Sequence, residues 1–330
     1  MATFMQTDAA FDMYNMDLNG VFQGASLGLN ESYAQAFGLS PSIGMFFDGT
    51  SVLVVGPAVP HDNHVQIDVV TPDPFDLYGT GMNPDGSGAC TTGTINWLKG
   101  SVNPGQGAIE IMGGTVAAAD FSAAVATASG ADDLTLLLQM FNGNDFFFGS
   151  TASDVMLLGA GADIYVDRGG SDRVEGRSGR DLIQGGLQGT SAGDDTLLGG
   201  SGDDILELNS GNGWVSGGSG QDTLILGMDN DHARGGAGAD TFIFPEARGR
   251  HVIVDFNPAV DDLVVPALFA EQGDLHFRQH GGTARIIFGD WSVSLRHVDL
   301  ADLDQDNLFL DGPLHGDANQ RDFVANFVLG

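Results

Sequence analysis

Three nine-residue segments in the second half of the chain share one pattern: GGSGDDILE (residues 199–207), GGSGQDTLI (217–225) and GGAGADTFI (235–243). Each begins with a glycine-rich stretch that ends in an aspartate, and each continues with three residues whose central member is apolar. Glycine adopts positive φ without steric cost and suits tight turns, whereas a short segment with an apolar centre suits a strand that faces a core. The pattern therefore predicts a turn followed by a short strand.

The same spacing continues outside these segments. Aspartates recur every nine residues, apart from a five-residue insertion at residues 185–189 and a glycine, Gly213, in one register. They are Asp145, Asp154, Asp163, Asp172, Asp181, Asp195, Asp204, Asp222, Asp231 and Asp240. The residue two positions after each register is apolar: Phe147, Met156, Tyr165, Val174, Ile183, Leu197, Leu206, Val215, Leu224, Ala233 and Phe242. Registers that repeat so regularly indicate a solenoid, in which each repeat packs on its neighbours.

This pattern resembles the RTX, or haemolysin-type, calcium-binding repeat, Gly-Gly-x-Gly-x-Asp-x-U-x, in which U is a large apolar residue. The resemblance implies a mainly β fold, a parallel β-roll whose coils contain two repeats each and whose stacked turns hold calcium. Calcium is a hard cation that takes about six to eight oxygen ligands, from carboxylates and backbone carbonyls. The implied metal-binding residues are Gly161, Asp163, Gly179, Asp181, Gly199, Gly200, Gly202, Asp204, Gly217, Gly218, Gly220, Asp222, Gly235, Gly236, Gly238 and Asp240, together with Asp145, Asp154, Asp172, Asp195 and Asp231.

Alternate repeats lie on opposite edges of such a roll, provided that the insertion loops out. The odd edge contains Asp145, Asp163, Asp181, Asp204, Asp222 and Asp240, and it keeps most of its glycines from Gly159 onward. The even edge contains Asp154, Asp172, Asp195, Gly213 and Asp231, and its turns depart from the pattern. We expect roughly four to seven calcium ions, at one per pair of stacked turns and mainly on the odd edge. The turn LNSGNG (208–213) lacks the key aspartate, which argues against a site there.

The excess of acidic over basic residues also favours bound cations. The 330 residues contain 44 acidic and 12 basic side chains, for a formal net charge of −32. A chain with this charge repels itself and repels nucleic acid, so we expect no nucleic-acid partner. Because 42% of the residues are hydrophobic, ordered cores are expected, with the acidic groups placed around bound cations.

Export and covalent stabilisation can also be judged from the sequence. Cys90 is the single cysteine, so no intramolecular disulfide can form, and we interpret it as an inert thiol. Residues 1–20 lack the pattern of a classical signal peptide, and no apolar run of about 18 residues predicts a membrane span. Residues 321–330 (RDFVANFVLG) look like the uncleaved C-terminal signal of proteins exported by type I secretion. We therefore expect a secreted, extracellular protein that fills with calcium after passing the type I machinery.

The remainder of the chain divides around the roll. We expect a β-rich N-terminal domain of unknown role (1–114), a helical cap (115–141), the calcium-binding roll (140–243), a C-terminal β cap (244–310) and a secretion tail (311–330). Within these segments, strands are predicted at 51–56, 64–70, 107–113 and within 283–310. Helices are predicted at 115–130 and 132–141.

The sequence contains no convincing motif of an enzyme active site. The zinc-protease motif His-Glu-x-x-His is absent, and no Gly-Lys-Ser or Gly-Lys-Thr follows the glycine-rich strings. HDNH (61–64) is interpreted as a pair of loop histidines, and GTSAG (189–193) lies beside the insertion, so it lacks the strand-to-helix context of a nucleophile elbow. The sequence thus leans away from an enzyme.

Three classes of function remain open. The first is a structural or interaction protein of the cell surface, in assembly, a lattice or adhesion, whose partner is another copy of itself or a surface glycan. The second is a secreted hydrolase or toxin with its site in residues 1–114. The third is a carbohydrate-binding module in the same segment, for which Tyr33, Phe46, Phe47 and Trp97 are candidates, although core packing explains these aromatic residues more simply.

Overall fold

The structure, a computed structural model, forms two compact units, Met1–Arg168 and Gly169–Gly330. Within residues 1–117 the structure describes the backbones of the strands and the side chains of Met13, Val116 and Ala117. Beyond them it describes residues 118–125, 130–186, 193–245, 248–266, 275–303 and 308–311.

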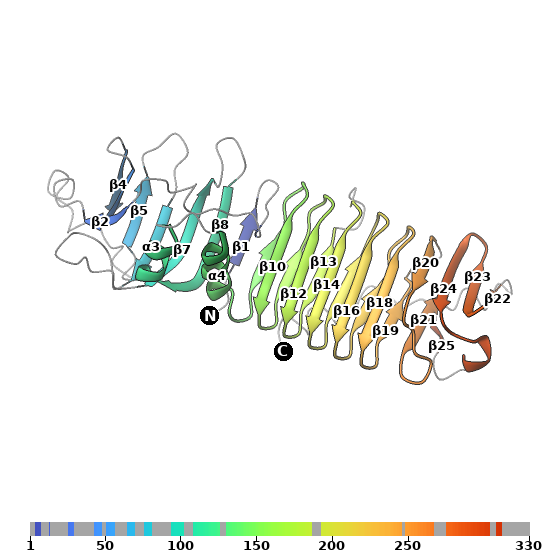
Figure 1. The fold of residues 1–330 in the computed structure, drawn as a ribbon. Helices are drawn as coiled ribbons and strands as arrows, with labels where there is room; N and C mark the ends of the chain where they lie inside the picture. Colours follow the sequence, from blue (N-terminus) through green and yellow to red (C-terminus); the bar gives the residue numbers. More distant parts are fainter. Residues whose placement is uncertain are drawn as a thin grey trace. The chain divides into compact units, whose positions relative to one another are not determined.

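The first unit contains an antiparallel sheet that continues into parallel strands (Figure 1). Strand β1 (Phe4–Thr7) pairs with β8 in antiparallel fashion and with β9 (Phe146–Phe148) in parallel. Strand β11 (Ile164–Val166) then pairs in parallel with β9. The predicted strands at 51–56, 64–70 and 107–113 correspond to β4, β5 and β8. The antiparallel strands are β2 (Ser26–Leu29), β3 (Ile43–Phe47), β4 (Ser51–Gly56), β5 (Val65–Val69), β6 (Asp76–Thr80), β7 (Thr94–Ser101) and β8 (Ala108–Ala117).

Two helices stand before the first repeat. Helix α3 (Ala118–Val125) begins later than the predicted residue 115, because residues 115–117 complete β8. Helix α4 (Gly130–Met140) corresponds to the predicted helix at 132–141. It buries Leu136, Leu137 and Met140, and Phe141 follows directly and packs edge-on against Phe147 with ring centroids 5.0 Å apart. The helix thus ends against the apolar interior of the first coil, to which β10 (Val155–Ala160) also belongs.

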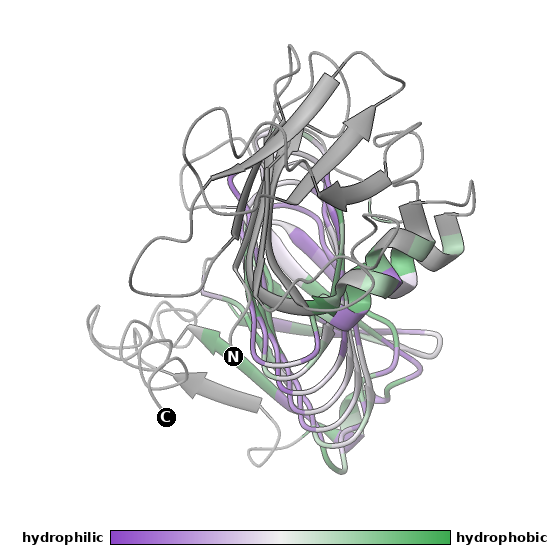
Figure 2. Ribbon diagram, turned by 90° about the vertical axis from the view of Figure 1, so that its left-hand side faces the viewer, coloured by the Kyte–Doolittle hydropathy of each residue, from purple (hydrophilic) through white to green (hydrophobic). Residues whose placement is uncertain are grey.

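The second unit is a parallel β-solenoid with two sheets (Figures 1 and 2). In Figure 2, which looks along the roll, the successive coils superimpose. One sheet, here called the acidic sheet, contains β13 (Leu182–Gly185), β15 (Ile205–Leu208), β17 (Thr223–Ile225), β19 (Thr241–Ile243), β21 (Asp262–Pro266) and β25 (Leu308–Asp311). The other, here called the basic sheet, contains β12 (Arg173–Ser178), β14 (Thr196–Ser201), β16 (Trp214–Ser219), β18 (His232–Ala237), β20 (Arg250–Ile253), β24 (Trp291–Arg296), β23 (Thr283–Phe288) and β22 (Leu275–His280). The predicted mainly β class and parallel roll are confirmed.

The repeat registers supply the core. All eleven apolar residues at the U position, from Phe147 to Phe242, are completely buried. The insertion does not disturb their stacking, because Ile183 pairs with Leu206, 23 residues later, whereas Leu206 pairs with Leu224, 18 residues later. Residues 187–192, which include the end of the insertion, lie outside the described part of the chain.

After the last coil of the second unit, the strand pairing of the basic sheet changes from parallel to antiparallel. Strand β20 pairs in parallel with β24, which continues into an antiparallel arrangement with β23 and β22. Trp291 is buried under this end and lies edge-on to Phe244, with ring centroids 5.4 Å apart. The short helix η2 (Leu300–Asp302) follows β24, and Asp299 caps its first turn.

Candidate metal sites

A ladder of aspartates runs along the odd edge, one from each coil. In each pair, the backbone N–H of one aspartate donates to Oδ1 of the aspartate one coil later. In the second unit the distances are 2.8 Å from Asp181 to Asp204, 2.9 Å from Asp204 to Asp222 and 3.0 Å from Asp222 to Asp240. In the first unit Asp145 donates to Asp163 over 2.8 Å. Each aspartate of this ladder is here called a rung. One carboxylate oxygen of each rung therefore holds the coils in register.

The second carboxylate oxygen of the rungs is placed differently. Oδ2 of Asp204, Asp222 and Asp240 is buried and has no hydrogen-bond donor among the described residues. Burial raises the pKa of Asp204 to about 7, and neighbouring aspartates add to the rise while the N–H of Asp181 opposes it. Burial likewise raises the pKa of Asp222 and of Asp240 to about 6. Burying an ionised carboxylate without a hydrogen-bond donor costs free energy, and a cation bound at these rungs would offset that cost.

In the second unit, the first glycine of each of these odd-edge turns lies beside this oxygen. A Cβ atom at Gly199 would collide with Oδ2 of Asp204 and would lie 2.6 Å from the carbonyl oxygen of Gly217. Cβ atoms at Gly217 and Gly235 would collide with Oδ2 of Asp222 and Asp240 in the same way. Carboxylate and carbonyl oxygens thus converge beside a position that tolerates no side chain. Hard oxygen donors in this arrangement fit calcium.

The glycines at the second and fourth positions of these turns have positive φ. In the turn that begins at Gly199, φ is 114° at Gly200 and 127° at Gly202. The same positions of the next two turns, Gly218, Gly220, Gly236 and Gly238, have φ between 111° and 142°. In the turn at 176–181 the second position is Arg177, whose φ of 77° is unfavourable for a residue with a Cβ atom.

The even edge has a ladder of the same kind, but on some of its rungs the second carboxylate oxygen also accepts a backbone N–H. Oδ1 of Asp231 accepts the N–H of Gly213 over 2.9 Å, while Oδ2 accepts the N–H of Gly227 over 3.0 Å and lies 3.3 Å from Nδ1 of His251. Oδ2 of Asp154 likewise accepts the N–H of Ser150 over 2.6 Å. Both Asp231 and Asp154 were predicted metal ligands, and both have a backbone donor on the oxygen that the odd edge leaves uncompensated.

The turn at 208–213, where the sequence argued against a site, is filled by protein groups. The side chain of Leu208 occupies the space beside Gly213. The amide nitrogen of Asn209 donates to the carbonyl oxygens of Gly185 and Gly186 on the preceding coil. Earlier on the same edge, Asp172 donates its N–H to Oδ1 of Asp195 over 2.9 Å.

Two buried aspartates were missed by the sequence analysis. Asp261 continues the odd-edge ladder: its Oδ1 accepts the N–H of Asp240 over 3.0 Å, and its Oδ2 accepts the N–H of Asn257 over 2.7 Å. It follows Asp240 by 21 residues, so allowing a three-residue insertion in the repeat would have found it.

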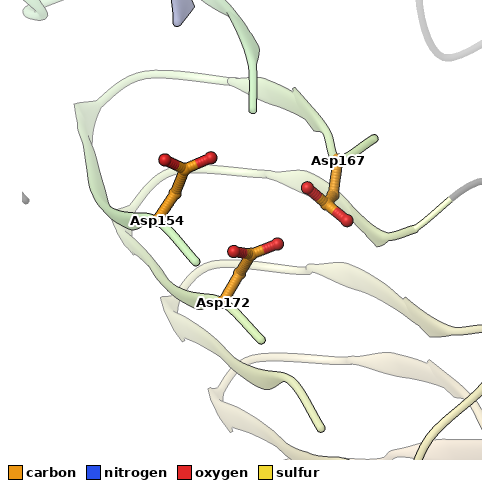
Figure 3. A group of neighbouring side chains, drawn as sticks. All are labelled: Asp154, Asp167 and Asp172. Atoms are coloured by element: carbon orange, nitrogen blue, oxygen red, sulfur yellow. The ribbon is translucent and has the colours of Figure 1, made fainter. Parts of the chain in front are cut away.

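Asp167 directly follows β11 and has no counterpart in the Gly-x-Asp pattern. It is completely buried in the first unit, and one of its carboxylate oxygens lies within 4.8 Å of a carboxylate oxygen of Asp154 (Figure 3). Figure 3 also labels Asp172, the first even-edge rung of the second unit. Buried aspartates of this kind are consistent with calcium sites.

Several sequence predictions fall outside the described residues. These are the histidines of 61–64, Cys90, most of 189–193, the tail at 312–330 and the side chains of Tyr33, Phe46, Phe47 and Trp97. None of the described helices has the length and apolar character that crossing a bilayer requires.

The stacked glycine turns and their aspartate ladder define a β-solenoid of the calcium-binding class. The model of the RTX calcium-binding nonapeptide repeat matches the chain in four copies, at residues 141–166, 167–188, 190–215 and 209–242. These four copies and the parallel β-solenoid fit a protein of the RTX type, as predicted, and repeats of this type bind calcium. No curated protein matches the chain.

Two solved structures are similar over part of the chain. The extracellular lipase of Serratia marcescens matches at 21% identity with a TM-score of 0.24, covering 51% of this chain and 38% of the lipase. A subunit of the Azotobacter vinelandii mannuronan C5-epimerase matches at 22% identity with a TM-score of 0.20, covering 54% of this chain and 82% of that one. The chain thus spans well under half the length of the lipase.

Proposed function

We propose that this RTX protein is secreted, folds as calcium fills its odd edge, and has a structural or interaction role at the cell surface, in assembly, a lattice or adhesion. The observation that carries the calcium part is the row of buried Oδ2 atoms on Asp204, Asp222 and Asp240 without a protein donor. Each lies beside the first glycine of its own turn, and at Asp204 the carbonyl oxygen of Gly217 on the next coil lies at the same place, so an ion there would contact both coils.

The sites of this proposal are the odd-edge glycines and aspartates from Gly161 and Asp163 to Asp240, with roughly four to seven ions in total. On the even edge, Asp154 and Asp231 are weaker candidates than Asp172 and Asp195. A backbone N–H occupies Oδ2 of Asp154 and Asp231, and Asn209 takes two carbonyl oxygens that a metal would need. The odd edge therefore accounts for most of the calcium.

Folding and export are linked in this proposal. At intracellular calcium levels, sites of the weak extracellular class, with a Kd of about 10⁻⁴ to 10⁻³ M, stay empty. Empty rungs repel one another in a chain of net charge −32, so the chain stays threadable during type I export. Outside the cell, binding energy becomes folding energy because the turns do not exist in the unfolded chain. RTX repeats are typical of secreted proteins, which supports this localisation.

Circular dichroism tests the folding step. The protein is stripped with a chelator, desalted and titrated with calcium to millimolar concentration. We expect β signal to rise cooperatively with calcium, and magnesium at the same concentration to have much less effect, since it demands a tighter octahedral site. A spectrum that does not change with calcium would contradict calcium-coupled folding.

Electron microscopy tests the surface role. The purified protein is imaged with calcium and after chelation. Calcium-dependent sheets or filaments support an assembly role, whereas a monodisperse monomer with calcium would overturn it and leave an interaction with a different partner to be examined by binding.

A further inference from the structure

The basic side chains of the second unit are concentrated on one sheet. Seven of the 12 lysines and arginines of the chain lie on the basic sheet, whose strands contain a single acidic residue, Glu175. The acidic sheet contains no lysine or arginine and three acidic residues, Glu207, Asp262 and Asp311. The strands of the basic sheet therefore carry six more basic than acidic side chains, in a chain of net charge −32. The seven residues are Arg173, Arg177, Arg234, Arg250, Arg278, Arg285 and Arg296.

One row of outward-facing side chains crosses all eight strands of this sheet. Successive side chains of a strand point to opposite faces of the sheet. The next residues along the strands, such as Val174 and Val215, are completely buried, whereas the row residues are half-buried or exposed. The side chains of the row therefore face outward. At about 4.8 Å per strand, the row is roughly 34 Å long. The cross-strand pairings give its order: Arg173, Thr196, Trp214, His232, Val252, Ser294, Arg285 and Arg278.

The middle of the row is a flat aromatic platform. The rings of Trp214 and His232 stack with an interplanar angle of 22° and centroids 6.2 Å apart. Both rings are half-buried on the outer surface of the sheet. A ring of this kind offers an apolar face together with a polar edge, which suits a ligand that has both C–H faces and hydroxyl groups.

Arginines lie beside this platform and at both ends of the row. Arg173 is 46% exposed and pairs with Glu175 over 2.7 Å, and Arg234 is 59% exposed and pairs with Asp255 over 3.3 Å. Exposed pairs of this type are weak, so an anionic ligand can compete for the guanidinium groups. Arg278 at the far end is also exposed. Guanidinium groups bind carboxylate and sulfate in a two-pronged geometry, which lysine cannot reproduce.

We propose that the basic sheet binds an acidic polysaccharide that lies across the strands, with sugar rings on Trp214 and His232 and its carboxylate or sulfate groups on the flanking arginines. The length of the row suits an extended chain of several sugars. Nucleic acid is the less suitable polyanion, because a single strand binds by stacking successive bases on aromatic side chains and the described row offers one stacked aromatic pair. The inference rests on the proposed function, since the sheet forms only in the folded roll.

Binding by the full chain at constant saturating calcium tests the inference. The probes are short oligogalacturonate, a heparin-derived oligosaccharide, a neutral glucan oligosaccharide of equal length and a single-stranded oligonucleotide. We expect one or both acidic glycans to bind with an affinity that falls as salt is raised. The first two probes distinguish carboxylate from sulfate as the recognised group. Equal binding of the neutral glucan, or tighter binding of the oligonucleotide, would overturn the proposal.

Variants locate the binding to this face. Trp214→Ala and Arg278→Ala are each expected to weaken binding of the acidic glycan by about tenfold. Thr223→Ala, on the outer face of the acidic sheet, is the matched control and should leave it unchanged. The calcium titration of each variant by circular dichroism separates the two proposals. Normal calcium-dependent folding without glycan binding overturns this inference alone, whereas failure of the unmodified chain to fold with calcium overturns the proposed function.

Discussion

Each odd-edge aspartate has two separate tasks, one for each of its oxygens. Oδ1 of Asp222 accepts a backbone N–H from the neighbouring coil, and its Oδ2 faces the glycine of its own turn without a donor. The first interaction persists with or without a metal, whereas the second is costly unless a cation or a proton arrives. Calcium and protons are therefore expected to compete for the same oxygen.

This competition predicts a pH dependence with a definite sign. The folded pKa values are about 7 for Asp204 and about 6 for Asp222 and Asp240, whereas the unfolded value is about 3.9. Between pH 4 and 7 the calcium-free folded state binds more protons than the unfolded state, so its stability falls as pH rises. Circular dichroism of calcium-free protein should show more β structure at pH 5 than at pH 7.5. Calcium affinity should be weaker at pH 5.5 than at pH 7.5, and the reverse trend in either measurement would contradict the assignment of these oxygens.

Gly217 provides a test of the space beside a rung. In Gly217→Ala the added methyl group collides with Oδ2 of Asp222, so the turn must distort or the carboxylate must move away from the metal position. We expect a loss of about 1–3 kcal/mol in calcium-bound stability and a higher calcium midpoint. Gly282→Ala is the control, because nothing lies within 4 Å of a Cβ atom there. Equal effects of the two substitutions would show that the collision is unimportant.

At Arg177, by contrast, a substitution is expected to increase stability. It has a φ of 77° at a turn position where neighbouring coils have glycine, and such a conformation costs a residue with a Cβ atom about 1 kcal/mol or more. Arg177→Gly is expected to raise the free energy of unfolding by up to about 1 kcal/mol, after the greater entropy of an unfolded glycine is subtracted. Ser178→Gly, one residue later and without positive φ, should be neutral or destabilising. Chemical denaturation of both variants with calcium present measures the difference.

At the scale of strands and turns, the sequence predicted the inside of the roll better than its edges. The U positions are all buried because a solenoid has one interior and one periodicity, and Ile183 keeps its place even across the insertion. The partners of a rung depend instead on neighbouring turns, which vary. Asp222 and Asp231 have equivalent places in the repeat, yet only Asp231 meets the N–H of Gly227 and the ring of His251. Asp261 was missed because a three-residue insertion hid its register.

The same difference predicts that two similar substitutions act differently. Asp222→Asn keeps an oxygen for the N–H of Asp204 and removes the charge on Oδ2, so we expect the number of bound calcium ions to fall by about one. Asp231→Asn turns an amide donor toward the N–H of Gly227, so we expect it to destabilise the roll by about 1–3 kcal/mol while the stoichiometry stays the same. Isothermal titration calorimetry gives the stoichiometry, and denaturation gives the stability. A loss of one ion in Asp231→Asn would place calcium on this even-edge rung as well.

At the scale of the whole molecule, calcium changes both charge and stability. Four to seven divalent ions contribute roughly 8 to 14 positive charges, which offset part of the net charge of −32 along the turn edges. The basic sheet lies between these edges and carries most of the arginines, so calcium loading makes its field more favourable for an anionic ligand.

Calcium linkage then predicts how steeply stability depends on concentration. An ion that binds only the folded state adds RT ln(1 + [Ca²⁺]/Kd) per site, so above Kd each tenfold rise in calcium adds about 1.4 kcal/mol for each ion. Four odd-edge ions should therefore add about 5 to 6 kcal/mol per decade, and the slope counts the ions taken up on folding. Denaturant unfolding at several free calcium concentrations between about 1 and 50 mM measures this slope. A slope below that of two ions would contradict an odd edge loaded at most of its turns, and an equal slope with magnesium would show that the ions act by general screening and not at sites shaped for calcium.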